Sequence, residues 1–258
     1  MTKPITAAER ALMDAQRRRA VSLSNGYVRR LVRLRTKEAG RVLDLCTSFL
    51  DYSAWADCIR TNLTERAYLP SWYKGLIVNG GLPAVTTTAR MLTGKAEALA
   101  SGVFEAGLAD YAERRVGSEI VTVSGTMKDT LIGILEKTVK EDMNIPVEKL
   151  TKVIMGDFAG HYATWQARRI AQTEVLNGLA EAGHQAAEAL DIPYLKQWSV
   201  SGLGNSRETH KAMDGKTVES YEMFRLPDCE MAYPHDTMNG TVEEIVNCAC
   251  TLIRRPKY

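Results

Sequence analysis

The 258-residue sequence contains few cysteines, few aromatic residues and no long hydrophobic run. Its five cysteines are odd in number, and the N-terminus lacks the apolar core of a secretory signal. We therefore expect free thiols in a reducing compartment and no disulfide framework. No stretch approaches the ~20 consecutive apolar residues that a membrane-spanning helix needs. Hydrophobic residues make up 45% and charged residues 25%, which is typical of a soluble globular protein and argues against intrinsic disorder.

The net charge of +2 conceals an uneven distribution. Residues 1–41 hold eleven basic and three acidic residues, a net charge of +8, so the remaining 217 residues carry −6. Such a chain can contact a polyanion or an acidic partner through one end. A solvated helix face is the plainer interpretation of the same charges. The candidate contact residues are Arg17, Arg18, Arg19, Arg29, Arg30, Arg33 and Arg35.

Helix-forming patterns fill most of the first two thirds of the chain. Turn formers at 68–88, among them Asn79-Gly80-Gly81, predict a loop or hairpin-like excursion. Further breaks are expected at Ser24-Asn25-Gly26, near Gly102, and near Gly156 or Gly160. The expected helical segments are 6–19, 27–49, 88–115, 126–141 and 147–190.

The pattern changes after Asp191-Ile192-Pro193, which ends the last long helix. We expect a strand over 194–200, a short helix over 206–214 with Gly215 at its C-terminus, and a closing strand over 244–253. The sequence therefore predicts a mainly α N-terminal region, residues 1–146, and a small α+β C-terminal module, residues 147–258.

The short helix carries the first candidate for chemistry. At 100° per residue, Arg207, His210 and Asp214 share one face. Such a histidine can act as a general acid or base, with Asp214 fixing its tautomer. The alternative is a polar clamp in which Arg207 and Asp214 satisfy His210. We favour the clamp because no paired nucleophile or second carboxylate stands nearby in the sequence.

The closing strand carries the second candidate. Alternation puts Val246, Cys248, Cys250 and Leu252 on one apolar face, where a free cysteine behaves as a small hydrophobe. We expect no metal there, because a Cys-x-Cys pair lacks the usual Cys-x₂₋₄-Cys spacing. The alternative is a zinc site that combines the two cysteines with some of His210, Cys229 and His235. The common phosphate-binding, serine-hydrolase and zinc-protease motifs are absent from the sequence.

Taken together, these C-terminal residues resemble the signature of the phage Mu F-like minor head proteins, the head morphogenesis family of tailed bacteriophages. The helix before them is similar to the Ile-Ala-Arg-Thr-Glu run of that family, although Gln172 stands where the family often has arginine and Ala249 replaces the usual arginine between the cysteines. The resemblance covers about residues 147–258. The residues that carry it are Arg169, Thr173, Glu174, Trp198, Arg207, His210, Asp214, Gly215, Phe224, Tyr233, Pro234, Asp236, Asn247, Cys248 and Cys250.

The resemblance implies a fold of the head-morphogenesis type and a virion component that acts in head assembly at the portal or capsid interior. It implies a non-enzymatic protein without a cofactor, found in the host cytoplasm during assembly and then in the virion head. The implied partners are the portal or major capsid protein, and non-specifically bound packaged double-stranded DNA. Some relatives carry toxin or enzyme modules after the head domain, which we do not expect here. The alternatives are a small nuclease or transferase using Arg207, His210 and Asp214, and a zinc-stabilised binding module.

Overall fold

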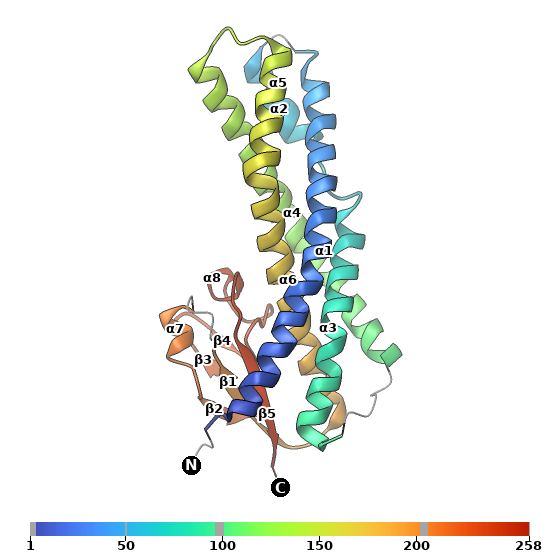
Figure 1. Cartoon of the computed structure of the whole chain (residues 1–258), viewed down its shortest axis with the longest axis vertical. Coiled ribbons are helices and arrows are strands. Elements are labelled where there is room, and N and C mark those ends of the chain that lie inside the picture. Colours follow the sequence, from blue (N-terminus) through green and yellow to red (C-terminus); the bar gives the residue numbers. More distant parts are fainter. Residues whose placement is uncertain (1–3, 50, 96–100, 202–205, 258) are drawn as a thin grey trace. The chain divides into compact units, whose positions relative to one another are not determined.

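The structure is a computed structural model that describes residues 4–49, 51–95, 101–201 and 206–257, with the backbone alone at 101–103 and 116–121. It is mainly helical, with a small antiparallel sheet in the C-terminal region, as the sequence predicts at this level. No described helix combines the length and apolarity that crossing a bilayer requires. The elements in chain order (Figure 1) are α1 (Ala7–Cys46), α2 (Tyr52–Asn62), α3 (Leu69–Thr93), α4 (Ser101–Glu141), α5 (Val147–Asp157), the π-helix η1 (Phe158–Tyr162), α6 (Ala163–Leu190), β1 (Tyr194–Ser199), α7 (Glu208–Lys211), β2 (Thr217–Glu219), β3 (Phe224–Arg225), β4 (Glu230–Met231), α8 (Val242–Ile245) and β5 (Thr251–Pro256).

The chain forms two compact units. The sheet unit comprises residues 1–24, 74–112 and 171–258, and the bundle unit comprises residues 25–73 and 113–170. The predicted boundary at 146/147 coincides with the start of α5 and does not separate these units. Each unit therefore combines segments that are distant in the sequence.

The bundle unit has a helical core with one buried ion pair. Arg35, which is 0% exposed, donates to both carboxylate oxygens of Glu65 at 2.7 and 3.0 Å. The same guanidinium donates to Oε1 of Gln166 and to the carbonyl of Val123, both at 2.9 Å. A buried charge of this kind is tolerated only when it is paired and hydrogen-bonded. The network thus fixes one arrangement of the helices around it.

The sheet unit is built on a three-stranded antiparallel sheet in the order β2-β1-β5. Strand β1 is paired along its whole length with β5, from Tyr194 opposite Pro256 to Ser199 opposite Thr251. The predicted strand at 194–200 is confirmed, and Gly215 has the positive φ, +78°, of the expected C-terminal glycine.

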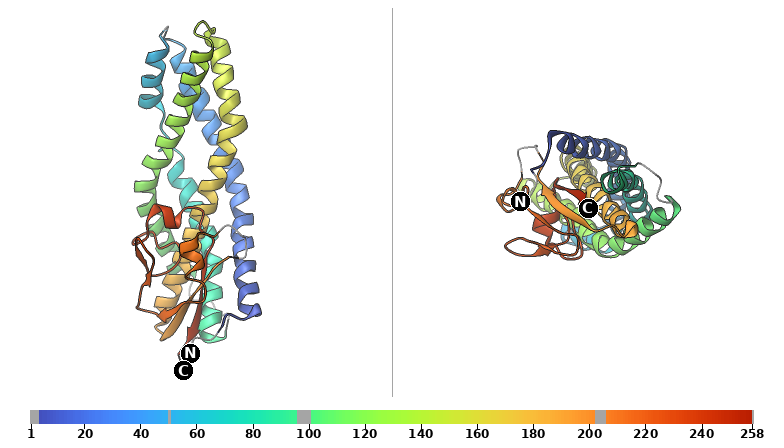
Figure 2. Two further views of the ribbon diagram at one scale, coloured as in Figure 1. Left: turned by 90° about the vertical axis from the view of Figure 1, so that its left-hand side faces the viewer. Right: turned by 90° about the horizontal axis from the view of Figure 1, so that it is seen from below.

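The beginning of α1 is tied to β5. Thr6 and Glu9 form a reciprocal capping arrangement, in which each backbone N–H donates to the other's side chain. Glu9 also forms a two-point ion pair with Arg255, both contacts at 2.9 Å, so the first turn of α1 lies beside the end of β5 (Figure 2). Partial burial raises the pKa of Glu9, but the hydrogen bonds from Arg255 and Thr6 outweigh it and lower that pKa to about 2.

The predicted loop at 68–88 is wrong, because residues 69–88 lie in α3. Its glycines allow close packing against α6. A Cβ added to Gly80 would lie 2.3 Å from Cγ2 of Val175, and one added to Gly81 would lie 2.7 Å from the carbonyl oxygen of Gly178. Glycine weakens a helix through its conformational freedom, and here the packing that only glycine permits offsets that cost.

The break predicted near Gly102 is confirmed to within a few residues, because α3 ends at Thr93 and α4 begins at Ser101, whereas the other predicted breaks differ from the structure. Helix α1 continues through Ser24, Asn25 and Gly26, and α4 continues from Ser101 to Glu141. The break expected near Gly156 or Gly160 is a single π-helical turn, η1, between α5 and α6. The predicted short helix at 206–214 is one turn, α7, and the predicted strand at 244–253 is the α8 turn followed by β5.

Candidate metal centre

The sheet unit brings His210, Cys248 and Cys250 together at one buried point. His210 comes from α7, and the two cysteines lie in the segment between α8 and β5. Nδ1 of His210 lies 3.5 Å from Sγ of Cys248 and 3.4 Å from Sγ of Cys250. The three side chains are 1%, 3% and 2% exposed, and their potential ligand atoms all lie within 4.8 Å of one another. This cluster has the chemistry of a soft metal site.

The other ring nitrogen of His210 faces a carboxylate. Nε2 lies 2.7 Å from Oε2 of Glu244, which is itself buried and accepts a hydrogen bond from Oγ1 of Thr209 at 3.1 Å. Nε2 therefore faces the carboxylate, and Nδ1 faces the two sulfurs. Glu244, and not Asp214, is therefore the carboxylate beside the His210 ring.

Sequence reasoning missed Glu244, although a signal for it was present. In the alternation predicted for 244–253, Glu244 falls on the same apolar face as Cys248 and Cys250. A carboxylate among apolar positions needs a buried partner. The strand geometry itself is absent there, because Glu244 lies in the α8 turn.

Aromatic side chains pack around the centre. The ring of Trp198, on β1, lies edge-to-face with His210 at 5.4 Å between centroids and with Phe224 at 5.2 Å. Trp198, Phe224, Cys248 and Cys250 belong to one buried core cluster. These rings pack against the imidazole and make this side of the centre apolar.

The two thiols of the centre differ in acidity. The pKa of Cys250 is lowered to about 5, first because Cys248 donates a hydrogen bond to its thiolate and further because His210 does so, against the opposing effect of burial. The pKa of Cys248 is raised well above its usual value by that same hydrogen bond and by burial.

A cleft of about 620 Å³ lies next to the centre, and all three residues of the cluster line it. Arg17 and Arg207 also line the cleft. Solvent and ions thus have a route to the sulfur atoms. A cleft of this volume is also large enough for a small molecule.

The predicted face of Arg207, His210 and Asp214 does not form. Helix α7 ends after one turn, and Arg207 precedes it as the N-cap, donating to the carbonyl of Val246. Asp214 is exposed, accepts a hydrogen bond from the backbone of Val200 at 2.9 Å and pairs with Arg10 at 3.3 Å. The predicted polar clamp is therefore wrong, because Arg207 and Asp214 bind other groups and neither contacts His210.

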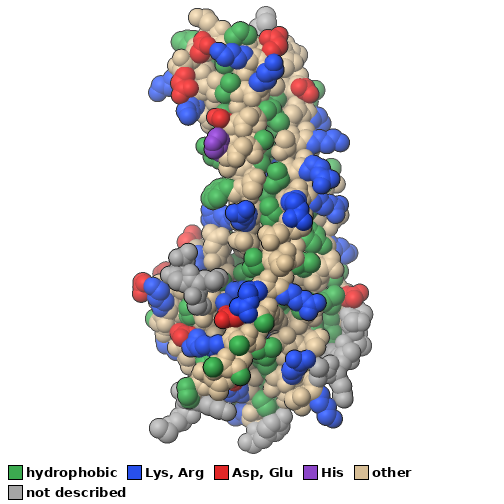
Figure 3. Space-filling view, viewed as in Figure 1, with side chains coloured by type: hydrophobic (Ala, Val, Ile, Leu, Met, Phe, Trp, Pro, Cys, Tyr) green, Lys and Arg blue, Asp and Glu red, His purple; other side chains and the backbone are tan. Residues whose placement is uncertain are grey.

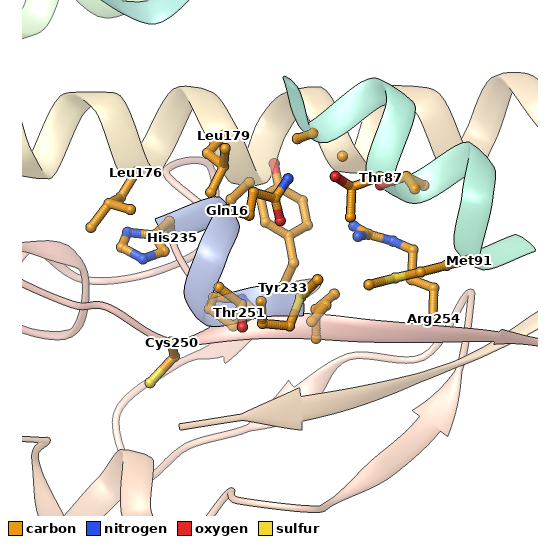
Figure 4. Close-up of a pocket in the computed structure, with 17 residues that line it drawn as sticks. Gln16, Thr87, Met91, Leu176, Leu179, Tyr233, His235, Cys250, Thr251 and Arg254 are labelled. Carbon is orange, nitrogen blue, oxygen red and sulfur yellow. The ribbon is translucent and has the colours of Figure 1, made fainter. Parts of the chain in front are cut away.

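Hydrogen bonds formed by Tyr233 and Asp236 stabilise the loop in which these residues lie. Asp236 accepts backbone hydrogen bonds from Ala232 at 2.9 Å and from Met238 at 3.0 Å. The hydroxyl of Tyr233 donates to Oε2 of Glu181 on α6 at 2.7 Å. The side chain of Tyr233 lines a small cavity of about 30 Å³, which has room for water and not for a substrate (Figure 4).

Two ligands considered in the zinc alternative stay outside the cluster. The imidazole of His235 contacts Oδ1 of Asn177 at 3.0 Å, and in Figure 4 the sulfur of Cys250 points away from that ring. Burial, together with the charge of His210, lowers the pKa of His235 to about 3. Among the described residues, Cys229 is likewise absent from the group that could hold an ion.

The helix motif, residues 169–174, and the cysteine motif, residues 247–250, are joined by a hydrogen bond. The backbone amide of Asn247 donates to Oγ1 of Thr173 on α6 at 3.3 Å. Glu174 is buried and accepts a hydrogen bond from Asn177 at 3.4 Å. Arg169 belongs to the bundle unit, where its guanidinium lies over the ring of Trp165 at 5.6 Å.

Five of the seven arginines predicted to contact a partner are exposed. Arg18, Arg19, Arg29, Arg30 and Arg33 are exposed, and Figure 3 shows Lys and Arg side chains gathered over this helix.

Arg17 and Arg35 are exceptions among the predicted contact residues. Arg17 is buried and paired with Asp14 at 2.7 Å, and Arg35 is enclosed with Glu65. Neither side chain is presented to a polyanion at the surface, so the predicted set reduces to the five exposed arginines.

The fold and the site define a mainly helical protein with a small antiparallel sheet and a buried His-Cys-Cys cluster. No family model matches the chain, and no solved structure matches it. A stretch of 91 residues, 34% of the chain, is 35% identical to the NAD(+)--arginine ADP-ribosyltransferase EFV of Enterococcus faecalis (strain ATCC 700802 / V583). That stretch spans 18% of the length of the enzyme.

Proposed function

We propose that the chain is a minor head protein of a tailed bacteriophage, and that its C-terminal module is a structural unit of head assembly. One observation carries this proposal: the residues that resemble the head-morphogenesis signature hold the module together. The hydrogen bond between Thr173 and Asn247 joins the helix motif to the cysteine motif, which follows it by 74 residues. Trp198, Phe224 and Tyr233 fill the core between the two motifs.

The geometry favours this role over the nuclease or transferase alternative. That alternative needs Arg207, His210 and Asp214 around one reacting group. Instead, Arg207 binds a backbone carbonyl, Asp214 binds a backbone amide, and His210 is enclosed among Glu244 and two sulfurs. We infer that the chain has no catalytic role in the head.

We assign contact with a partner to the exposed arginines of α1, of which Arg18 and Arg19 belong to the sheet unit and Arg29, Arg30 and Arg33 to the bundle unit. Arg18, Arg19, Arg29, Arg30 and Arg33 can neutralise phosphates of packaged double-stranded DNA or an acidic face of the portal or capsid protein. Their contacts with phosphate would be independent of base sequence, because only the backbone carries the charge.

ADP-ribosyl transfer is a second candidate function, favoured by the identity with the Enterococcus faecalis enzyme. The shared stretch is less than a fifth of that enzyme, so we give this candidate less weight. The test is to incubate the purified chain with labelled NAD and an arginine-rich acceptor protein. Label transferred to the acceptor at a rate proportional to chain concentration would establish this function instead of ours; we expect none.

Binding to portal rings tests the assembly proposal. The portal protein encoded nearest to the gene of this chain is purified as a ring and mixed with the chain, and the two are sedimented together. We expect the chain to sediment with the ring or, in a parallel experiment, with capsid shells. A chain that stays in the supernatant with both would contradict the proposal.

A further inference from the structure

We propose that His210, Cys248 and Cys250 bind a Zn²⁺ ion through Nδ1 and the two Sγ atoms. Zinc sites are tetrahedral, with Zn–S near 2.3 Å and Zn–N near 2.0–2.1 Å, so the edge between a sulfur and a nitrogen ligand is about 3.6 Å. The two S···N separations in the structure are 3.5 and 3.4 Å. Two of the three edges of the cluster therefore match those of a zinc tetrahedron, and the third, between the two sulfurs, is no longer than 4.8 Å.

Two sulfur donors and one nitrogen donor favour zinc at this centre. Thiolate and imidazole ligands favour zinc over magnesium and calcium, which prefer oxygen donors. Binding Zn²⁺ requires both cysteines as thiolates, so any proton still bound to either sulfur is released to solvent when the ion enters. Two thiolates and one neutral imidazole then balance the charge of the ion.

The surroundings of the cluster are also those of a metal site. A histidine ligand usually directs its second ring nitrogen to a carboxylate, which orients the ring and fixes the tautomer. Glu244 occupies that position at 2.7 Å from Nε2. Trp198 and Phe224 form an apolar wall beside the centre.

Water completes the proposed coordination. Within the part of the chain that the structure describes, no further His, Cys, Asp or Glu joins the three ligands. All three ligands line the cleft of about 620 Å³, so the fourth position is accessible to a water molecule. The inference rests on the local geometry alone and does not depend on the proposed role in phage heads.

Metal content provides the first test. The full chain, without a histidine tag, is expressed in zinc-supplemented medium, purified without chelator and measured by plasma mass spectrometry; we expect about one zinc per chain. Cys248→Ser and Cys250→Ser should each reduce this content several-fold, whereas Cys229→Ser, a cysteine of the same unit outside the cluster, should leave it unchanged. Wild-type protein that holds far less than one zinc, and takes up none when zinc is added, would overturn the proposal.

Cobalt spectroscopy keeps the test decisive if a cysteine variant fails to fold. Wild-type chain stripped of metal is titrated with Co²⁺, and tetrahedral thiolate coordination should produce a sulfur-to-metal charge-transfer band and intense visible d–d bands. Glu244→Gln should retain these bands but weaken zinc affinity about 10–100-fold, as carboxylate partners of metal-bound histidines do. A cluster held only by S–H···N hydrogen bonds would give no bands, and that result would also overturn the proposal.

Discussion

The backbone amide of Asn247 donates a hydrogen bond to the hydroxyl of Thr173, 3.3 Å away. This hydrogen bond holds the segment that carries Cys248 against helix α6. The two are 74 residues apart in the sequence. Thr173 is buried, whereas Asn247 is exposed, so this hydrogen bond ties a surface residue to the interior of the unit. The position of the cysteines therefore depends on a residue of the helix motif.

Replacing this acceptor should destabilise the sheet unit. Thr173→Val keeps the shape of the side chain but removes the acceptor of the Asn247 amide, and the lost hydrogen bond should cost about 0.5–1.5 kcal/mol. The matched control is Thr126→Val, whose exposed hydroxyl bonds only the carbonyl one helical turn before it. Urea unfolding measures both variants, and an equal loss in the two would contradict the assigned role of Thr173.

The buried ion pair of the bundle unit gives a second prediction. Glu65→Gln leaves the guanidinium of Arg35 without its counter-charge in a fully buried site, and we expect a loss of about 3–5 kcal/mol. Asp57→Asn changes the same group in an exposed pair with Arg60 and should cost about 0–1 kcal/mol. Chemical unfolding of both variants compares them. If the losses were similar, Arg35 would not depend on Glu65.

His235 should make stability fall with acidity. Its pKa is lowered from 6.5 to about 3 in the folded chain, so below pH 6.5 the unfolded chain binds a proton that the folded chain does not. Stability should then decrease from pH 6.5 toward pH 3, at up to about 1.4 kcal/mol per pH unit, and this contribution is fully present above pH 6.5. His235→Gln should have a shallower slope in urea unfolding over this range. Parallel slopes would show that His235 is not buried in its neutral form.

DNA affinity should depend strongly on salt. Each phosphate contact contributes about 0.9 to the slope of log affinity against log salt. Arg29→Glu, Arg30→Glu and Arg33→Glu together should reduce both the affinity for non-specific duplex and this slope. The control reverses three exposed lysines elsewhere in the bundle unit, Lys137, Lys149 and Lys152. An affinity that is flat between low and moderate salt would exclude the DNA contact and leave the protein partner.

Sequence patterns predicted the ends of C-terminal elements correctly where a proline or a glycine determines the backbone conformation. Ile192-Pro193 ends α6 and precedes β1. Gly215 adopts the left-handed conformation expected after a helical turn. The predicted loop at 68–88 was wrong because the glycines there serve packing: Gly81 meets the backbone of Gly178, a relationship that no local window contains.

The site was predictable in its residues and not in its geometry. His210, Cys248 and Cys250 were considered together, but strand alternation left the cysteines on an apolar face. The partner of His210 was predicted to be Asp214, because both were expected on one helix face. Since α7 ends after a single turn, the partner is instead Glu244, whose position depends on the tertiary fold.

Mass spectrometry of purified heads tests the central proposal most directly. Phage particles are produced from a genome that carries the gene of this chain and purified by density gradient, with particles from the deleted genome as the control. We predict peptides of this chain in the purified heads, in fewer copies than the major capsid protein, and defective or fewer heads after the deletion. Heads without these peptides, assembled normally after the deletion, would contradict the role that we propose.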